Sequence, residues 1–218
     1  MRIHLKINSS NQIIPFDHQP LLVGTIHKWL GHNDVHGEVA LFSFSRLEKG
    51  KNQEDGLKFT QGTSFFISAY DASMIKKLVS GIQRDPTMFC GLTVMEIIIE
   101  EDPNLTNREL FYIASPIFIS RRIGDKIEQI FFDDSRASGF LKETLETKMG
   151  KVGMYDDSFE IHFDFNCPNA GTKMITYKGI KNKANWCSVI IKGKPETKLF
   201  AWNVGLGNST GIGFGAIK

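Results

Sequence analysis

The sequence predicts an α+β protein made of two tandem copies of a β-α-β-β-α-β plan, and three observations support this. Residues 2–8 alternate between polar and apolar side chains, which is typical of a half-buried strand. Two segments with apolar residues at helical spacing, 20–31 and 71–83, are separated by strand-like stretches. A polar break at 100–104 precedes a second set of similar segments.

The first half follows the plan in order. Pro20 is suited to the first turn of a helix, where its missing N–H costs nothing, and Gly31 ends the apolar repeat. Segments 41–47 and 57–70 read as strands, and 87–100 is rich in β-branched residues. The resulting order, β-α-β-β-α-β, is the ferredoxin-like unit, which RRM modules share.

The second half repeats this order less regularly. Ser135 is a plausible N-cap for a helix over 135–148. Further predicted segments are strands at 109–119, 159–165, 173–178 and 186–192, a turn at 179–185, a short helix at 196–203 and a last strand at 214–218. We therefore predict two ferredoxin-like domains, 1–102 and 107–218.

Bulk properties narrow the class of protein. The formal net charge of +2 does not by itself indicate a nucleic-acid partner. Three widely spaced cysteines fit neither a disulfide framework nor a C-x-x-C metal motif. No apolar run approaches the ~20 residues that span a bilayer. We expect a soluble protein of the reducing cytoplasm, with no membrane partner and no cofactor.

Lysines concentrate in one segment. Residues 173–198 contain seven lysines and one acidic residue, Glu196. A solvated hairpin would also have this composition, but the excess of charge favours contact with phosphates. The residues expected to act together in RNA binding are Lys178, Lys181, Lys183, Lys192 and Lys194, with Arg121 and Arg122 extending the surface.

Glycines dominate the last sixteen residues, with five at positions 205, 207, 211, 213 and 215. The spacing is neither a Walker loop nor a dinucleotide fingerprint, because no Lys-Ser/Thr and no further helix follow. A tight strand connection would need fewer glycines, since each costs roughly 0.5–1 kcal/mol relative to alanine. The run therefore favours a backbone cradle for an anion. The expected RNA-binding positions are Gly205, Gly207, Asn208, Ser209, Thr210, Gly211, Gly213 and Gly215.

The glycine pattern, Gly205-x-Gly207-x-x-x-Gly211-x-Gly213-Phe-Gly215, carries a resemblance to a known family. Supporting motifs are His18-Gln-x-Leu-Leu-x-Gly-x-Ile26-His27, Phe42-Ser-Phe-Ser-Arg-Leu47 and Ser115-Pro-Ile-Phe-Ile119. Together they resemble the CRISPR-associated endoribonucleases of the RAMP superfamily, which cut precursor CRISPR RNA within each repeat. The resemblance implies metal-independent cleavage, in which the ribose 2′-oxygen attacks the adjacent phosphate and leaves 2′,3′-cyclic phosphate and 5′-hydroxyl ends.

The resemblance also implies catalytic residues. A histidine is expected between the first helix and the second strand, where His36 fits better than His32, and a second at the position of His27. Helical geometry puts His27 at the edge of the apolar stripe, from which it can reach a cleft. The lysine that some relatives place after the catalytic histidine is missing between Gly37 and Leu47. Lys28, Lys49 and Lys51 are the candidates for that electrostatic support.

Several alternatives stay open at this point. Histidines 27, 32 and 36 could bind zinc, although the helix ends at Gly31, which disfavours an i, i+4 pair on one face. A non-catalytic RNA-binding subunit of a CRISPR effector complex would share the fold. The implied partner is precursor CRISPR RNA; other effector subunits and a second copy of the chain are further candidates.

Overall fold

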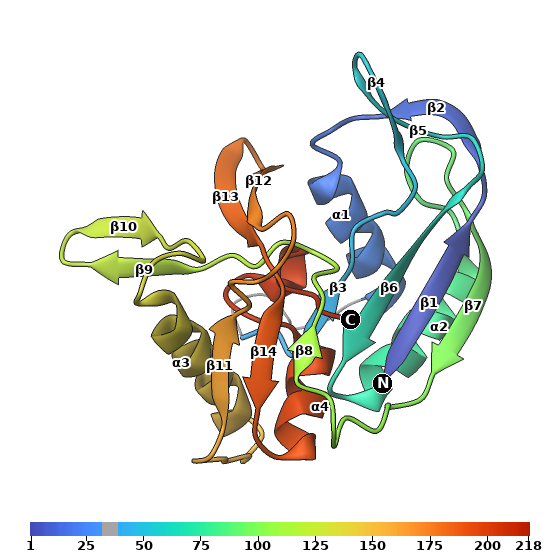
Figure 1. The fold of residues 1–218 in the computed structure, drawn as a ribbon. Helices are drawn as coiled ribbons and strands as arrows, with labels where there is room; N and C mark the ends of the chain where they lie inside the picture. Colours follow the sequence, from blue (N-terminus) through green and yellow to red (C-terminus); the bar gives the residue numbers. More distant parts are fainter. Residues whose placement is uncertain (32–38) are drawn as a thin grey trace.

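The computed structural model describes residues 1–31 and 39–218, and it confirms the α+β prediction. The first half contains an antiparallel sheet of order β3-β6-β1-β7, the strand order of a ferredoxin-like unit (Figure 1). Its helices lie behind this sheet in Figure 1. The elements are β1 (Arg2–Ile7), α1 (Gln19–Leu30), β3 (Phe42–Phe44), β6 (Thr63–Ala69), α2 (Ala72–Arg84) and β7 (Val94–Glu100).

The two helices of the first half pack closely against each other. A Cβ added at Gly81 of α2 would lie 1.9 Å from the Trp29 carbonyl oxygen of α1, so only glycine permits this approach. Trp29 is itself buried, and its indole donates to the Asp85 carbonyl at 2.8 Å. A small additional sheet of order β2-β5-β4 flanks this unit, formed by β2 (Ser10–Ile14), β4 (Lys51–Gln53) and β5 (Gly56–Phe59).

The second half repeats the unit around a sheet of order β11-β14-β8, which an isolated bridge between Ile113 and Ile217 extends. Two hairpins, β9–β10 and β12–β13, project from this half in Figure 1. The elements are β8 (Leu110–Phe111), β9 (Ser120–Ile123), β10 (Lys126–Gln129), α3 (Ala137–Gly150), β11 (Glu160–Phe163), β12 (Gly171–Tyr177), β13 (Ile180–Trp186), β14 (Val189–Lys192), α4 (Pro195–Val204) and the 3₁₀ turn η1 (Thr210–Ile212).

Three local predictions in this half are wrong. The N-cap of α3 is Arg136 and no side chain caps the helix, so Ser135 does not have the predicted role. Residues 180–186 form a strand rather than a turn, because the chain reverses tightly at Lys178–Gly179, where both residues have positive φ. The predicted strand 109–119 reduces to β8 and isolated bridges at Ile113, Ile117 and Phe118, and the predicted strand 214–218 reduces to the bridge of Ile217 with Ile113.

Buried contacts join the two halves. The guanidinium of Arg2 lies between the Phe66 ring, 3.8 Å from its centroid, and the Trp202 ring, 3.4 Å away. Its Nη2 donates to the carbonyls of Trp202 and Ile217 at 3.1 and 2.7 Å. The N-terminal ammonium donates to Asn203 Oδ1 of the second half at 2.8 Å. The halves therefore hold a fixed relative position through desolvated, charge-assisted contacts.

Each half also has its own hydrophobic core. One cluster draws its buried residues from 3–94 and the other from 105–217. The segment 101–109 between them has no helix or strand. The domain boundary at 102/107 stays a prediction. No helix in the described ranges is both long and apolar enough to cross a bilayer.

Candidate functional site

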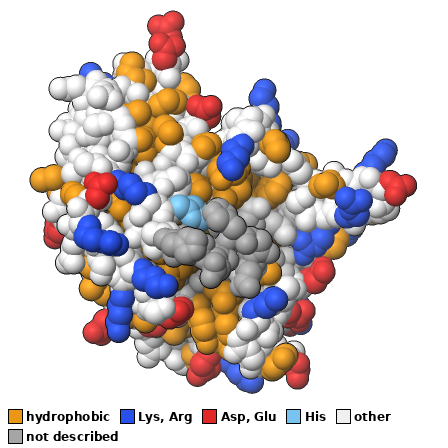
Figure 2. All heavy atoms as spheres, turned by 180° about the vertical axis from the view of Figure 1, so that it is seen from behind, with side chains coloured by type: hydrophobic (Ala, Val, Ile, Leu, Met, Phe, Trp, Pro, Cys, Tyr) orange, Lys and Arg blue, Asp and Glu red, His pale blue; other side chains and the backbone are white. Residues whose placement is uncertain are grey.

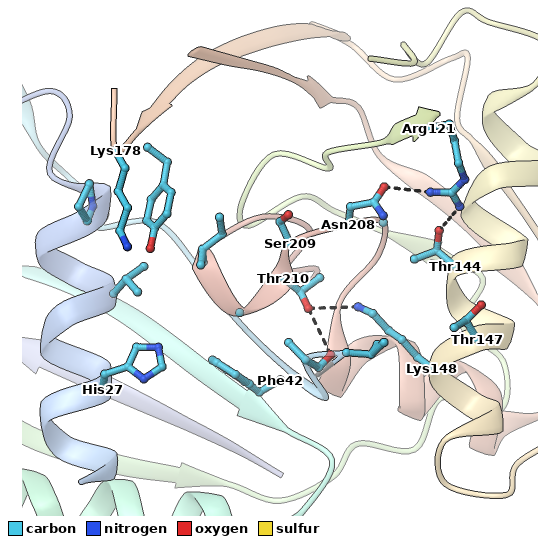
Figure 3. A pocket seen from close by; sticks show the side chains of 18 of the residues that line it. His27, Phe42, Arg121, Thr144, Thr147, Lys148, Lys178, Asn208, Ser209 and Thr210 are labelled. Atoms are coloured by element: carbon cyan, nitrogen blue, oxygen red, sulfur yellow. Dashed lines mark hydrogen bonds between the residues drawn. The ribbon is translucent and has the colours of Figure 1, made fainter. Parts of the chain in front are cut away.

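A cleft of about 890 Å³ lies between the two halves of the protein. One wall is α1, the opposite wall is α3, and the glycine-rich loop forms the floor (Figure 3). The tip of the β12–β13 hairpin lines the same space through Tyr177 and Lys178. Figure 2 shows Lys and Arg side chains on both halves of the face opposite the view of Figure 1. The cleft thus brings together segments from both ends of the chain.

His27 is the histidine of this cleft that the structure describes. Along α1, Val23, Ile26 and Leu30 are buried, whereas His27 is half-buried at the edge of that stripe. Its imidazole extends from α1 toward the glycine-rich loop (Figure 3). Gly24, one turn earlier on the same face, lines the cleft with no atom within 4 Å of its Cβ position. His27 therefore lines the cleft with a half-buried imidazole.

The glycines at the base of the loop serve packing. Gly205, Gly207, Gly213 and Gly215 are buried and have φ between +71° and +94°. A Cβ at Gly207 would lie 2.4 Å from the Phe118 oxygen, and one at Gly215 would lie 1.9 Å from the Leu206 oxygen. Positive φ together with backbone this close leaves no room for a side chain. Of these four, only Gly207 lines the cleft.

The tip of the loop, Asn208–Gly211, is the part that faces the cleft. Ser209 is exposed and adopts a left-handed conformation with φ of 61°. Gln19, in the first turn of α1, donates from Nε2 to the Ile212 carbonyl at 2.8 Å and ties the loop to the first half. The structure thus restricts the candidate anion cradle to the tip and leaves Gly205, Gly213 and Gly215 beneath it.

Arg121 holds the tip from the other side. Its Nη1 donates to Asn208 Oδ1 at 3.1 Å, and its Nη2 donates to Thr144 Oγ1 of α3 at 2.6 Å (Figure 3). Its side chain is 17% exposed, and Glu143 lies 3.5 Å from Nε. Arg122, the next residue on β9, is exposed and does not line the cleft. The two arginines, which the sequence grouped together, have different environments.

Lys148 of α3 is a residue of this cleft that the sequence interpretation missed. It is 3% exposed, and its Nζ donates to Thr210 Oγ1 at 3.1 Å and to the carbonyls of Val204 and Gly205, both at 3.2 Å. Burial lowers the pKa of Lys148 to about 7, because the charged form loses its hydration. A sequence signal existed, since Lys148 follows Leu141 and Leu145 at the spacing of the buried stripe.

The three lysines proposed as electrostatic support lie elsewhere. Lys28 donates to Asp85 Oδ2 at 2.8 Å and to the Thr87 carbonyl at 2.5 Å. Lys49 borders a different groove, and Lys51 is exposed on β4. Lys148 and Lys178 are instead the lysines that line the cleft in the described part of the chain. His32 and His36 lie outside the described residues.

The lysine-rich segment 173–198 does not form one surface. Lys178, Lys181 and Lys183 belong to the β12–β13 hairpin, whereas Lys192 ends β14 and Lys194 precedes α4. Because β14 leads away from the hairpin after Val189, these last two lysines lie at the other end of the sheet (Figure 1). The expectation that all five act together is not supported by this arrangement.

Metal ligands can be assessed only in part. Across residues 1–31 and 39–218, no three His, Cys, Asp or Glu side chains are grouped so that they could hold a metal ion. The zinc alternative involved His32 and His36, which this statement does not cover.

Comparisons with known proteins agree with this architecture. The family model described as CRISPR associated protein Cas6, C-terminal, matches residues 99–218, which is more than half of the chain. A Pyrococcus furiosus protein named as a CRISPR-associated endoribonuclease-like protein, Cas6, is 25% identical over 246 residues, covering 100% of this chain and 98% of the relative.

Solved structures share the fold over the full length. The product of a Cas6-related gene from Pyrococcus furiosus superimposes with a TM-score of 0.84 at 23% identity, covering 100% of this chain and 97% of the other. A RAMP protein described as binding different RNA substrates gives a TM-score of 0.83 at 20% identity, covering 100% and 98%. With the family match over its second half, the chain belongs to the Cas6 family of CRISPR-associated proteins.

Proposed function

We propose that this protein is a metal-independent endoribonuclease that cuts CRISPR repeat RNA in the precursor transcript. The observation that carries the proposal is the cleft in which His27 faces the tip of the glycine-rich loop, with Lys148, Lys178 and Arg121 among its lining residues. Family membership and an endoribonuclease-like relative support an activity on RNA.

The proposed reaction is attack of a ribose 2′-hydroxyl on the adjacent phosphorus. The 2′-oxygen bonds to phosphorus as it loses its proton to a base, and the P–O5′ bond breaks as an acid protonates the leaving oxygen. The products are a 2′,3′-cyclic phosphate and a 5′-hydroxyl. Two imidazoles can serve as base and acid because histidines ordinarily titrate near pH 6.5. We assign these roles jointly to His27 and His36.

The negative charge on the phosphorane needs compensation. Lys28, Lys49 and Lys51 are poorly placed for this, because none of them lines the cleft. Lys178 reaches the cleft from the hairpin, and Lys148 lies under its floor. Lys178 can stabilise the developing charge as a preorganised cation, and Lys148 can do so in its protonated form. They replace the lysine that the sequence lacks after His36.

The proposed partner is precursor CRISPR RNA, with the hairpin lysines contacting its phosphates. The RAMP protein of the same fold, described as binding different RNA substrates, is compatible with this assignment. Single-stranded or looped RNA would fit a cleft that offers an exposed loop tip, an imidazole and a tyrosine, since bases and phosphates are then both accessible.

Cleavage of a labelled repeat RNA in EDTA tests the proposal directly. We expect cutting to persist without divalent metal and to stop when the ribose at the cut is 2′-deoxy. The 5′ fragment should resist 3′-end ligation until its cyclic phosphate is opened and the resulting monophosphate is removed to leave a 3′-hydroxyl. Cutting of the deoxy substrate, or loss of cutting in EDTA, would contradict the mechanism.

A second candidate is a non-catalytic RNA-binding subunit of a CRISPR effector complex. One observation favours it: His27 is the only histidine among the described residues that line the cleft. This function predicts tight, salt-sensitive RNA binding with no cleavage, and it predicts that His27→Ala changes neither.

A further inference from the structure

Among the residues that the structure describes, Lys148 is buried without a carboxylate partner. Its three contacts are two backbone carbonyls, from Val204 and Gly205, and the hydroxyl of Thr210. In the described part of the chain, no ion pair includes Lys148. A buried ammonium usually has an anion beside it, because desolvation otherwise disfavours the charge. A missing counter-charge is thus part of this site.

The surroundings indicate where an anion would supply that charge. Thr210 is buried directly against Lys148 Nζ, and Ser209, one residue before it, is exposed at the loop tip. An anion bound at Ser209 would therefore lie beside Thr210, the residue whose hydroxyl contacts the ammonium. Among the described residues, the other charged or titratable side chains that line the cleft are Arg121 and Glu143 near α3, Tyr177 and Lys178 on the hairpin and His27 on α1.

Of these groups, Glu143 is the only carboxylate. It lies 3.5 Å from Arg121 Nε and is 63% exposed, so solvent and Arg121 compensate much of its charge. The remaining groups are the cations Arg121 and Lys178, a histidine and a tyrosine. The described residues of the cleft therefore attract an anion while offering Lys148 no carboxylate partner.

We propose that a phosphate of the RNA backbone is seated against the Asn208–Gly211 tip and that its binding drives Lys148 to take up a proton. The inference rests on the proposed function, since it takes RNA as the anion. The proton comes from solvent, and the only bond formed is the third N–H bond of the amine. Burial keeps the pKa of Lys148 at about 7 in the free protein, so a large fraction of the amine is available to accept it near neutral pH.

Protonation also changes the hydroxyl of Thr210. The ammonium donates to Thr210 Oγ1, so the hydroxyl hydrogen must point elsewhere, and the Ala40 carbonyl lies 3.5 Å away. A neutral amine can instead accept that hydrogen. Proton uptake thus couples the seated phosphate to the loop and to the segment that leads into β3.

Calorimetry with a repeat RNA carrying a 2′-deoxy ribose at the cut measures this coupling. Binding heats are compared at pH 8 in two buffers of different ionisation enthalpy. Histidines contribute little there, because they ordinarily titrate near pH 6.5. We expect an uptake approaching one proton, and an affinity that falls by up to about tenfold per pH unit above pH 7.

Three variants separate the inference from a merely structural effect, with melting temperature checking the fold. Lys148→Met should abolish the uptake and the pH dependence. Lys148→Arg should keep tight binding at pH 8 without uptake, because arginine does not titrate there. Lys151→Met, at an exposed position where α3 ends, should behave like wild type.

Heats that do not depend on the buffer, or uptake that persists in Lys148→Met, would overturn the inference while leaving RNA cleavage intact. A wild-type protein that cleaves repeat RNA but shows no uptake would do the same. Failure of the wild type to bind the RNA would overturn the proposed function and the inference together.

Discussion

Arg121 Nη1 donates a hydrogen bond to Asn208 Oδ1 at 3.1 Å, linking hairpin β9–β10 to the glycine-rich loop. The same amide oxygen also accepts from the Ser120 backbone N–H at 2.9 Å. Asn208 N–H in turn donates to the Phe118 carbonyl at 2.7 Å. The tip of the loop is therefore fixed by its neighbours before any RNA arrives, as preorganised sites require.

Arg121→Ala should lower both the free energy of unfolding and the rate of cleavage. Arg122→Ala should change neither the stability of the fold nor the position of the loop. The first change leaves Asn208, Thr144 and the Phe140 carbonyl without a charged donor, which costs about 1–3 kcal/mol. Urea unfolding and single-turnover cleavage measure the two effects. Equal stability of the two variants would show that the Arg121 contacts do not hold the loop.

Two glycine-to-alanine changes should have opposite signs. At Gly215, positive φ and a Cβ position 1.9 Å from the Leu206 oxygen should cost more than about 2 kcal/mol. At Gly24, inside α1 with open space at the Cβ position, alanine should add about 0.5–1 kcal/mol. Thermal denaturation of both variants checks this. A stable Gly215→Ala protein would mean that the loop can pack differently.

Hairpin lysines should control the salt dependence of RNA binding. Lys178→Gln with Lys181→Gln should lower the slope of log K against log salt by up to about 1.4, which corresponds to two single-strand phosphate contacts. The matched double variant, Lys192→Gln with Lys194→Gln, should keep the wild-type slope. Filter binding at several salt concentrations measures both. Equal decreases of the slope in the two double variants would indicate that all four lysines contact the RNA as one surface, as the sequence suggested.

Lys148 should make stability depend on pH in a defined direction. Burial lowers the pKa of Lys148 from its ordinary value of 10.5 to about 7 in the folded protein, so the unfolded state binds more protons between these values. The cost of the buried charge is thus full below pH 7 and fades as pH rises toward 10.5. The change that Lys148→Met makes to the melting temperature should therefore be more favourable at pH 6 than at pH 10, by roughly 2–4 °C for each kcal/mol of buried-charge cost removed. A change in melting temperature that is more favourable at pH 10 than at pH 6 would contradict this pH dependence.

Much of the fold could be predicted because the first half combines clear periodicity with strong end signals. The stripe of α1 and the alternation of β1 identified their elements, and His27 could be placed at the edge of that stripe. The glycine run was harder to interpret. The glycines at the base of the loop are required because backbone from distant segments packs against them, as the Phe118 oxygen does at Gly207. The spacing of glycines along the chain does not show which distant segments will pack there.

Lys148 shows the same difficulty at the site. Its position in the apolar stripe of α3 was visible, but its role depends on the end of α4 and on Thr210, more than fifty residues away. The lysine segment failed for a related reason. Lys183 and Lys192 are only nine residues apart in the sequence. They are separated in space because Lys183 lies on the β12–β13 hairpin, whereas Lys192 lies at the end of β14 in the β11-β14-β8 sheet.

Single-turnover cleavage of repeat RNA by His27→Ala is the most direct test of a catalytic cleft. The matched control is His162→Ala, a half-buried position on β11 that does not line the cleft. We predict that His27→Ala binds the RNA like wild type but cleaves it about 10²–10⁴-fold more slowly, while His162→Ala cleaves at the wild-type rate. Undiminished cleavage by His27→Ala would contradict the account.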